Sequence, residues 1–170
     1  MSAPPISDQL AEWAAAGNFT LTPEDDSGAA IFWSTGGETR LYVRRKQDGY
    51  ALTRAQRGST ENFELFAPKM STIERYLYGQ FGAAYRSMRH LKRLRVPSKR
   101  ELIVPGYSLS DIDKEGHCTL SSQVGDAVAV AAGDISAVSR LVMLSHFLSS
   151  SLSDLTASYS DAEGRPLFPG

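Results

Sequence analysis

Apolar and polar residues alternate along much of the first 67 positions, and a period of two indicates half-buried β-strands. The alternation is clearest in residues 39–45, where leucine and valine are interleaved with arginine and tyrosine, so one face should be buried and the other basic. Elsewhere apolar residues recur three or four positions apart, which predicts amphipathic helices. This second pattern covers residues 8–16, 71–82, 135–148 and 152–159. Together the two patterns predict an α+β fold with N-terminal, central and C-terminal helices.

Five strands are predicted in succession before the central helix, each followed by a turn signal. They cover residues 19–22, 30–34, 39–45, 50–54 and 63–66. Between the third and fourth strands, Asp48-Gly49 is a strong hairpin signal, because this dipeptide readily adopts the positive φ angles of a tight turn. We therefore expect an antiparallel meander of about five strands. A later hairpin is expected from 118–122 and 127–132, and Glu101 to Val104 is a further candidate strand.

Short polar residues stand where the predicted helices begin. Ser7 and Ser151 can each cap a helix, because a serine hydroxyl accepts a hydrogen bond from a free backbone N–H of the first turn. Ser71 and Glu74 form the S-x-x-E pattern of a capping box. Asp134 is expected to cap the helix at 135–148, which should be the longest in the chain.

Composition limits the fold to one compact unit. The chain has 170 residues and 42% apolar content, enough to fill one core, so we expect a single domain over residues 1–170. Cys118 is the one cysteine, which excludes an internal disulfide and is compatible with a reducing compartment. The N-terminus lacks the pattern of a signal peptide, and apolar runs stay well short of the roughly 20 residues of a membrane span. These features predict a cytoplasmic protein without a membrane partner.

The sequence lacks the usual catalytic motifs, which predicts that the protein is not an enzyme. Nucleophile-elbow, phosphate-loop, dinucleotide-binding, C-x-x-C and H-E-x-x-H patterns are all missing. His146 lies in an apolar helix, where a packed histidine is the simpler interpretation. His117 and Cys118 are neighbours in a predicted strand and should point to opposite faces, which argues against a shared metal site. We expect neither a cofactor nor a metal ion.

A basic stretch at residues 86–100 is the one marked shift in composition. Its cations, together with Tyr85 for base stacking, would suit a nucleic-acid surface. The alternative is a surface helix or strap whose leucines and valine feed the core while its charges face water. The formal charge of the whole chain is −1, whereas a dedicated nucleic-acid protein is usually basic throughout.

Acidic residues cluster in two predicted loops, at 24–26 and 111–115. Such residues often only keep loops soluble. The alternative is protein recognition, in which the carboxylates, with aromatic side chains nearby, dock into a basic cleft of a partner.

Several segments, in order along nearly the whole chain, resemble a family of bacterial immunity proteins, the family that includes the antitoxin of tuberculosis necrotizing toxin. The segments are LAEWAAAGNFTLT, IFWSTGGETRLYV, NFELFAP, ERYLYGQFG, SLSDID, GDAVAVA and GRPLF. The resemblance implies a small cytosolic inhibitor that binds a cognate NAD-hydrolysing toxin domain and covers its cofactor cleft. The catalysis would then belong to the toxin.

If such a cleft binds the pyrophosphate of NAD, it should be lined by cations or helix N-termini, and loop carboxylates could imitate the anion. The candidate toxin-binding residues are Glu24, Asp25, Asp26, Asp48, Asp111 and Asp113, with Tyr50 and Tyr107 as aromatic anchors. Toxin binding without a nucleic-acid partner is the favoured interpretation, and a nucleic-acid-associated regulatory protein using residues 86–100 is the alternative.

Overall fold

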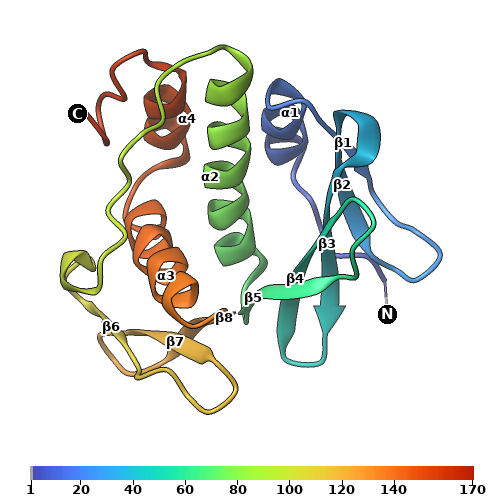
Figure 1. The fold of residues 1–170 in the computed structure, drawn as a ribbon. Coiled ribbons are helices and arrows are strands. Elements are labelled where there is room, and N and C mark those ends of the chain that lie inside the picture. The colour runs from blue at the N-terminus through green and yellow to red at the C-terminus, as the bar shows by residue number, and fades with distance from the viewer. Residues whose placement is uncertain (1) are drawn as a thin grey trace.

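An antiparallel sheet of eight strands, in the order β1-β2-β3-β4-β5-β8-β7-β6, forms one layer of the protein, and the helices pack against it as a second layer (Figure 1). The computed structural model describes residues 2–170. The strands are β1 Phe19–Thr22, β2 Ala30–Ser34, β3 Thr39–Lys46, β4 Gly49–Gln56, β5 Asn62–Ala67, β6 Tyr107–Leu109, β7 His117–Ser122 and β8 Ala127–Ala132. The helices are α1 Asp8–Ala16, α2 Met70–Met88, α3 Ile135–Leu148 and α4 Leu152–Ser160, with 3-10 turns η1 Thr35–Gly37 and η2 Arg100–Leu102.

The buried face of the sheet can be traced through residues that stand directly opposite one another on neighbouring strands. The pairs are Phe32 with Leu41, Val43 with Leu52, Leu52 with Leu65, Leu65 with Ala131, Ala131 with Cys118, and Ala129 with Leu120. All of these residues are buried. Because side chains alternate between faces, the intervening residues of these strands point away from the helices.

The predicted meander is confirmed in β1 to β5, and the predicted later hairpin is confirmed in β7 and β8. The hairpin does more than was expected, because β8 pairs with β5 and so extends the same sheet. The predicted strand at 101–104 is wrong. Residues 100–102 form the turn η2, in which Leu102 N–H donates to Lys99 O, and the strand next to β7 begins at Tyr107.

Two of the four predicted helix caps are confirmed. Ser7 accepts a hydrogen bond from Leu10 N–H, and Ser151 accepts one from Asp154 N–H. The capping box is wrong, because α2 already begins at Met70 and Glu74 Oε1 instead accepts from Ser7 N–H at 3.1 Å.

The predicted Asp134 cap is also wrong. With φ 55° and ψ −116°, this residue differs from the extended conformation of a capping residue, and its N–H donates to Gly116 O. The longest helix is α2, with 19 residues, rather than α3 with 14. Within residues 2–170, no single helix is long and apolar enough to cross a membrane; α3 and α4 pass that test only as a pair bent by 113°.

The glycines of the ERYLYGQFG segment are explained by helix packing. A Cβ atom added at Gly79 would collide with the ring of Phe147 from α3, and one at Gly82 would collide with the ring of Tyr159 from α4. Because both glycines lie on the buried face of α2, they allow α3 and α4 to approach closely.

Candidate partner-binding site

Strand directions divide the predicted site residues between opposite ends of the sheet. In an antiparallel sheet, alternate loops lie at the same end. Residues 23–29, 47–48 and 123–126 therefore lie at one end, which we call the turn end. Residues 57–61, 110–116 and 133–136 lie at the other, which we call the split end. The structure thus brings the 24–26 loop to the same end as Asp48, and it separates both from Asp111 and Asp113.

At the turn end, Glu24, Asp26 and Asp48 are exposed, whereas Asp25 is engaged within its own loop. The Asp25 carboxylate accepts hydrogen bonds from Ser27 Oγ at 2.7 Å and from the N–H groups of Ser27 and Ala29. These bonds, led by the one from the Ser27 hydroxyl, lower the pKa of Asp25. Asp25 therefore shapes the loop that displays its two neighbours.

The two predicted aromatic anchors are half-buried and pack against the core. The Tyr50 hydroxyl accepts a hydrogen bond from Arg45 Nη1 at 3.0 Å, and the Arg45 guanidinium lies 5.3 Å from the ring centre. Tyr107 begins β6 and pairs with Ser122, which places it at the turn end, away from Asp111. Tyr50 does adjoin Asp48, as the hairpin prediction implied.

At the split end, Asp111 is exposed, whereas Asp113 closes a tight turn. Asp113 Oδ1 accepts hydrogen bonds from Glu115 N–H and His117 N–H, both at 2.9 Å. Ligand atoms of Asp113, Glu115 and His117 lie within 4.8 Å of one another, so these three residues could hold a cation, a grouping that the sequence analysis did not anticipate. Cys118 faces the core, on the opposite side of β7 from His117, as predicted.

A pocket of about 410 Å³ lies at the split end, where β5 and β8 diverge after only two residue pairs. It is lined by Arg54, Gln56, Asn62, Phe63, Glu64, His117, Ala132, Gly133, Ser136 and Arg140. Arg140 Nη1 bridges the gap by donating to Glu64 O and Ala132 O, where a regular sheet would carry strand-to-strand hydrogen bonds. Sequence reasoning missed this pocket, although the glutamate inside the apolar NFELFA strand was a usable signal.

The face of the sheet opposite the helices carries the basic and aromatic residues that the alternation in 39–45 predicted. The Arg44 guanidinium stacks over Tyr42 at 4.9 Å and binds Glu61 with both Nη atoms. Arg40 lies over Trp33, 5.8 Å from the ring centre. These side chains shield one another, so the face is a layer of stacked side chains and not an open apolar surface.

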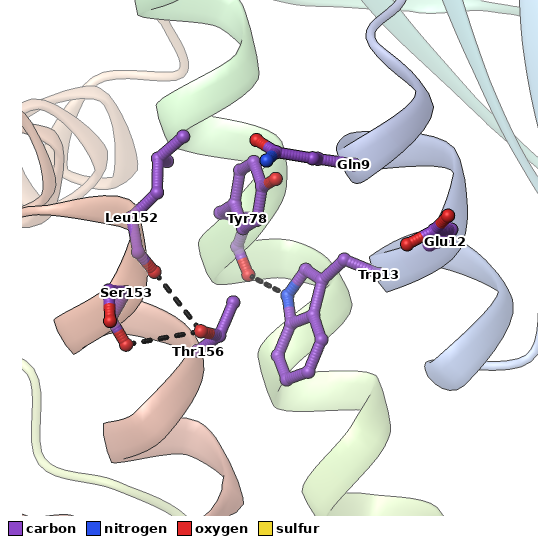
Figure 2. Close-up of a pocket in the computed structure, with 7 residues that line it drawn as sticks. All are labelled: Gln9, Glu12, Trp13, Tyr78, Leu152, Ser153 and Thr156. Atoms are coloured by element: carbon purple, nitrogen blue, oxygen red, sulfur yellow. Dashed lines mark hydrogen bonds between the residues drawn. The ribbon is translucent and has the colours of Figure 1, made fainter.

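Figure 2 shows a second hollow, a groove of about 380 Å³ between α1, α2 and α4. Trp13 Nε1 donates to Tyr78 O at 2.9 Å across the two helices, and Thr156 Oγ1 donates to Leu152 O and Ser153 O within α4. Because these polar groups bind inside the chain, we interpret the groove as a joint between helices.

The basic stretch is a strap that runs from the end of α2 past α4 and α3 toward β6 (Figure 1). Arg86 is 2% exposed and lies inside the protein, where its guanidinium donates to four backbone carbonyls. Arg89 stacks on Tyr85, and Lys92 binds Glu163. The strap interpretation is confirmed for Leu94 and Val96, which pack against the core, but it is wrong for Arg86, whose charge is buried and does not face water.

Comparisons with known proteins agree with the resemblance seen in the sequence. Residues 13–167 match the model of a family described as immunity protein 61. "Immunity factor for TNT" of Mycobacterium tuberculosis (strain ATCC 25618 / H37Rv) and "Immunity factor for TNT homolog" of Mycobacterium bovis (strain BCG / Pasteur 1173P2) are similar. Each is 37% identical over 167 residues, which cover 96% of this chain and 92% of the relative. The solved structure of "Rv3902c from M. tuberculosis" superposes with a TM-score of 0.87 at 37% identity, covering 96% of this chain and 94% of that one.

Proposed function

This chain belongs to the immunity protein 61 family, and we propose that the toxin it neutralises hydrolyses NAD. Membership of an immunity protein family makes the chain an antitoxin with a protein partner, and confirms the prediction that it is not an enzyme. The observation that carries the proposal is the 37% identity to an "Immunity factor for TNT" across 96% of the chain. We place the encounter in the cytoplasm, where the free thiol of Cys118 would stay reduced.

We propose that inhibition works by covering the cofactor cleft of the toxin. A cleft that binds a pyrophosphate needs cations or helix N-termini, and exposed carboxylates on a rigid loop can occupy the same positions. Two sets of carboxylates are available: Glu24, Asp26 and Asp48 at the turn end, and Asp111 with Asp113 at the split end. Because the sets stand at opposite ends of the sheet, a single cleft can engage only one of them.

Charge reversal at each end tests this mechanism. One variant carries Glu24→Lys, Asp26→Lys and Asp48→Lys, another carries Asp111→Lys, and Glu101→Lys on η2 serves as the control. The cognate toxin domain is the partner, and NAD consumption and the dissociation rate are the readouts. Reversal at the inhibitory end should weaken binding by about 2–5 kcal/mol, mainly through faster dissociation, because it leaves the partner's cations unpaired.

Two different outcomes would contradict the two parts of the proposal. If the toxin domain consumes no NAD, the assignment of its substrate is wrong. If neither reversal weakens inhibition while both variants stay folded, the carboxylates do not occupy the cleft. For the nucleic-acid alternative, Arg86 is buried and Lys92 is paired, so the strap would have to bind through its other exposed cations, such as Arg93 and Arg95.

A further inference from the structure

We infer that the split end is the surface that docks on the toxin, and that its pocket receives a carboxylate side chain of that toxin. The inference rests on the proposed function only in taking a toxin protein as the partner. Three observations on separate residues support it: an excess of positive charge in the pocket, an apolar rim beside it, and a strained residue that presents part of the rim.

The pocket holds two guanidinium groups and, among its described lining residues, one carboxylate. Glu64 Oε1 accepts from Arg54 Nε at 2.8 Å and lies 3.9 Å from Arg140 Nη2, while its Oε2 accepts from Tyr76 Oη at 3.0 Å. Glu64 is therefore already shared between both arginines. One positive charge remains uncompensated inside the lining, because Asp113 and Glu115 reach His117 but do not line the pocket.

The arginines also keep donors that the rest of residues 2–170 does not use. Arg54 binds Glu64 and Gln80 through Nε and Nη2, which leaves Nη1 free. Arg140 uses Nη1 for its two carbonyls, which leaves Nε and Nη2 without a hydrogen bond. These donor atoms are accessible to solvent, and both arginines line the pocket. A carboxylate matches this arrangement, because its two oxygens accept from guanidinium groups in a fixed geometry.

Exposed apolar side chains at the split end, which we call the apolar rim, accompany this polar pocket: Phe63 lines it, and Ile112 and Ile135 belong to segments at the same end of the sheet. Phe63 is 36% exposed, Ile112 37% and Ile135 80%, which makes half of the six exposed large apolar side chains found in residues 2–170. The Phe63 ring lies 5.7 Å from the His117 ring, and Gly116 O accepts from the N–H groups of Gly133 and Asp134, next to Ile135. Exposed apolar side chains beside a charged pocket that takes one polar anchor are typical of a protein interface.

Asp134 holds part of this rim in place at a conformational cost. Its φ of 55° and ψ of −116° lie outside the left-handed region that aspartate tolerates. Backbone strain of this kind is concentrated at functional sites. Here the strained residue directly precedes Ile135, the first residue of α3, whose side chain projects into solvent.

Two variants test the inference, each with a matched control at the turn end. Ser136→Glu adds a carboxylate to a residue that lines the pocket, where it can occupy the arginines in place of the toxin's carboxylate. Its control is Ser71→Glu, because Ser136 and Ser71 are both exposed and both the second residue of a helix. Ile135→Lys places a charge on the rim, and Val124→Lys does the same at a residue that is 83% exposed in the β7–β8 turn.

Affinity for the cognate toxin domain and the melting temperature are measured for all five proteins. Ser136→Glu and Ile135→Lys should each weaken binding at least about tenfold, as is common when a central anchor is blocked. Their melting temperatures should not fall, since an acid in the first helical turn is favourable and Ile135 is exposed. The two controls should bind like the original chain.

The outcomes separate the inference from the proposed function. If the original chain does not bind the toxin, both fail. If it binds and the split-end variants keep their affinity, or the turn-end controls lose theirs, the docking inference alone is overturned. Titration with sodium acetate, followed through the Nε–H resonances of Arg54 and Arg140, tests whether the pocket binds a small anion. If these resonances shift but the split-end variants keep their affinity for the toxin, the pocket is a small-anion site and the docking inference is overturned.

Discussion

Arg86→Met is expected to destabilise the protein strongly, although it removes no ion pair. The guanidinium donates through Nε to Lys92 O at 2.7 Å, through Nη1 to Tyr159 O and Asp161 O at 3.0 and 2.6 Å, and through Nη2 to Ala162 O at 3.0 Å. One side chain at the end of α2 thus ties down the start of the strap and the end of α4. The carbonyls at the C-terminus of α4 also favour a cation there.

The size of the effect follows from what the substitution leaves behind. Methionine fills a similar volume but donates no hydrogen bond, so four carbonyls lose the bond from Arg86, and within residues 2–170 only Asp161 O keeps another donor, Gly164 N–H. Each buried carbonyl left without a donor costs about 1–3 kcal/mol. The total is smaller than the sum over the carbonyls, because neighbouring losses are not additive and the structure relaxes and admits water. A hydrogen bond that involves a charged group contributes about 1.5–3 kcal/mol, so after this partial relaxation we expect a total loss of about 3–5 kcal/mol. Total stabilities are about 5–15 kcal/mol, so the variant should be marginal.

Urea unfolding measures this loss as a lower midpoint at an unchanged slope. The melting temperature should fall by about 6–20 °C, from roughly 2–4 °C per kcal/mol for a chain of this size. Arg86→Lys should lie in between, because an ammonium group cannot reproduce the planar fork of donors. The control is Arg95→Met, an exposed arginine of the same strap, which should change stability by less than about 0.5 kcal/mol. A loss below about 1 kcal/mol for Arg86→Met would refute the reasoning.

Three further predictions follow from other parts of the structure. Gly49→Ala should cost about 1–3 kcal/mol in urea unfolding, because the new methyl group would stand 2.8 Å from Pro68 Cα. The loss for Gly49→Ala should exceed the loss for Gly58→Ala, because an added Cβ atom at Gly58, where φ is 71°, meets no other atom within 4 Å. Equal losses would show that packing is not the cause. Glu61→Gln should lower stability at neutral pH, because the hydrogen bond from Arg44 holds the pKa of Glu61 below its usual 4.5. A carboxylate with a lowered pKa stabilises the fold above that usual value and loses its effect as the pH falls through the folded value, so the difference between the two proteins should close in acid; a constant difference would contradict the assignment. The purified chain should leave NAD intact, and turnover that disappears on substituting His146 or His117 would show that it is an enzyme after all.

Short sequence patterns were sufficient to predict features that depend on neighbouring residues, such as the faces of a strand and the caps of helices. The alternation in residues 39–45 correctly identified the buried and the basic face of β3, and Ser7 and Ser151 cap the helices that they precede. The hairpin at Asp48-Gly49 was also correct, but its reason was not. Gly49 begins β4 with a nearly extended φ of 159°, and glycine is needed because the backbone of Ala67 and Pro68 passes close by. That contact is made across the sheet and leaves no mark on the neighbouring sequence.

The same distinction explains why the two ends of the sheet could not be told apart in advance. The loops at 24–26 and 111–115 have similar acidic compositions, but their places depend on β8 joining the meander at β5, a pairing of only two residues. That short pairing leaves a gap between β5 and β8, which Arg140 of α3 bridges from a position 76 residues beyond Glu64 in the sequence. Charge alone would classify Arg54, Arg86 and Arg140 together as surface cations. They differ in their hydrogen-bond partners. Arg86 is buried and donates to four backbone carbonyls, whereas Arg54 and Arg140 share the Glu64 carboxylate and keep free donor atoms. Unused hydrogen-bonding capacity makes Arg54 and Arg140 candidates for binding a partner within the pocket at the split end, whereas Arg86, whose donors are all engaged by carbonyls, is not a candidate.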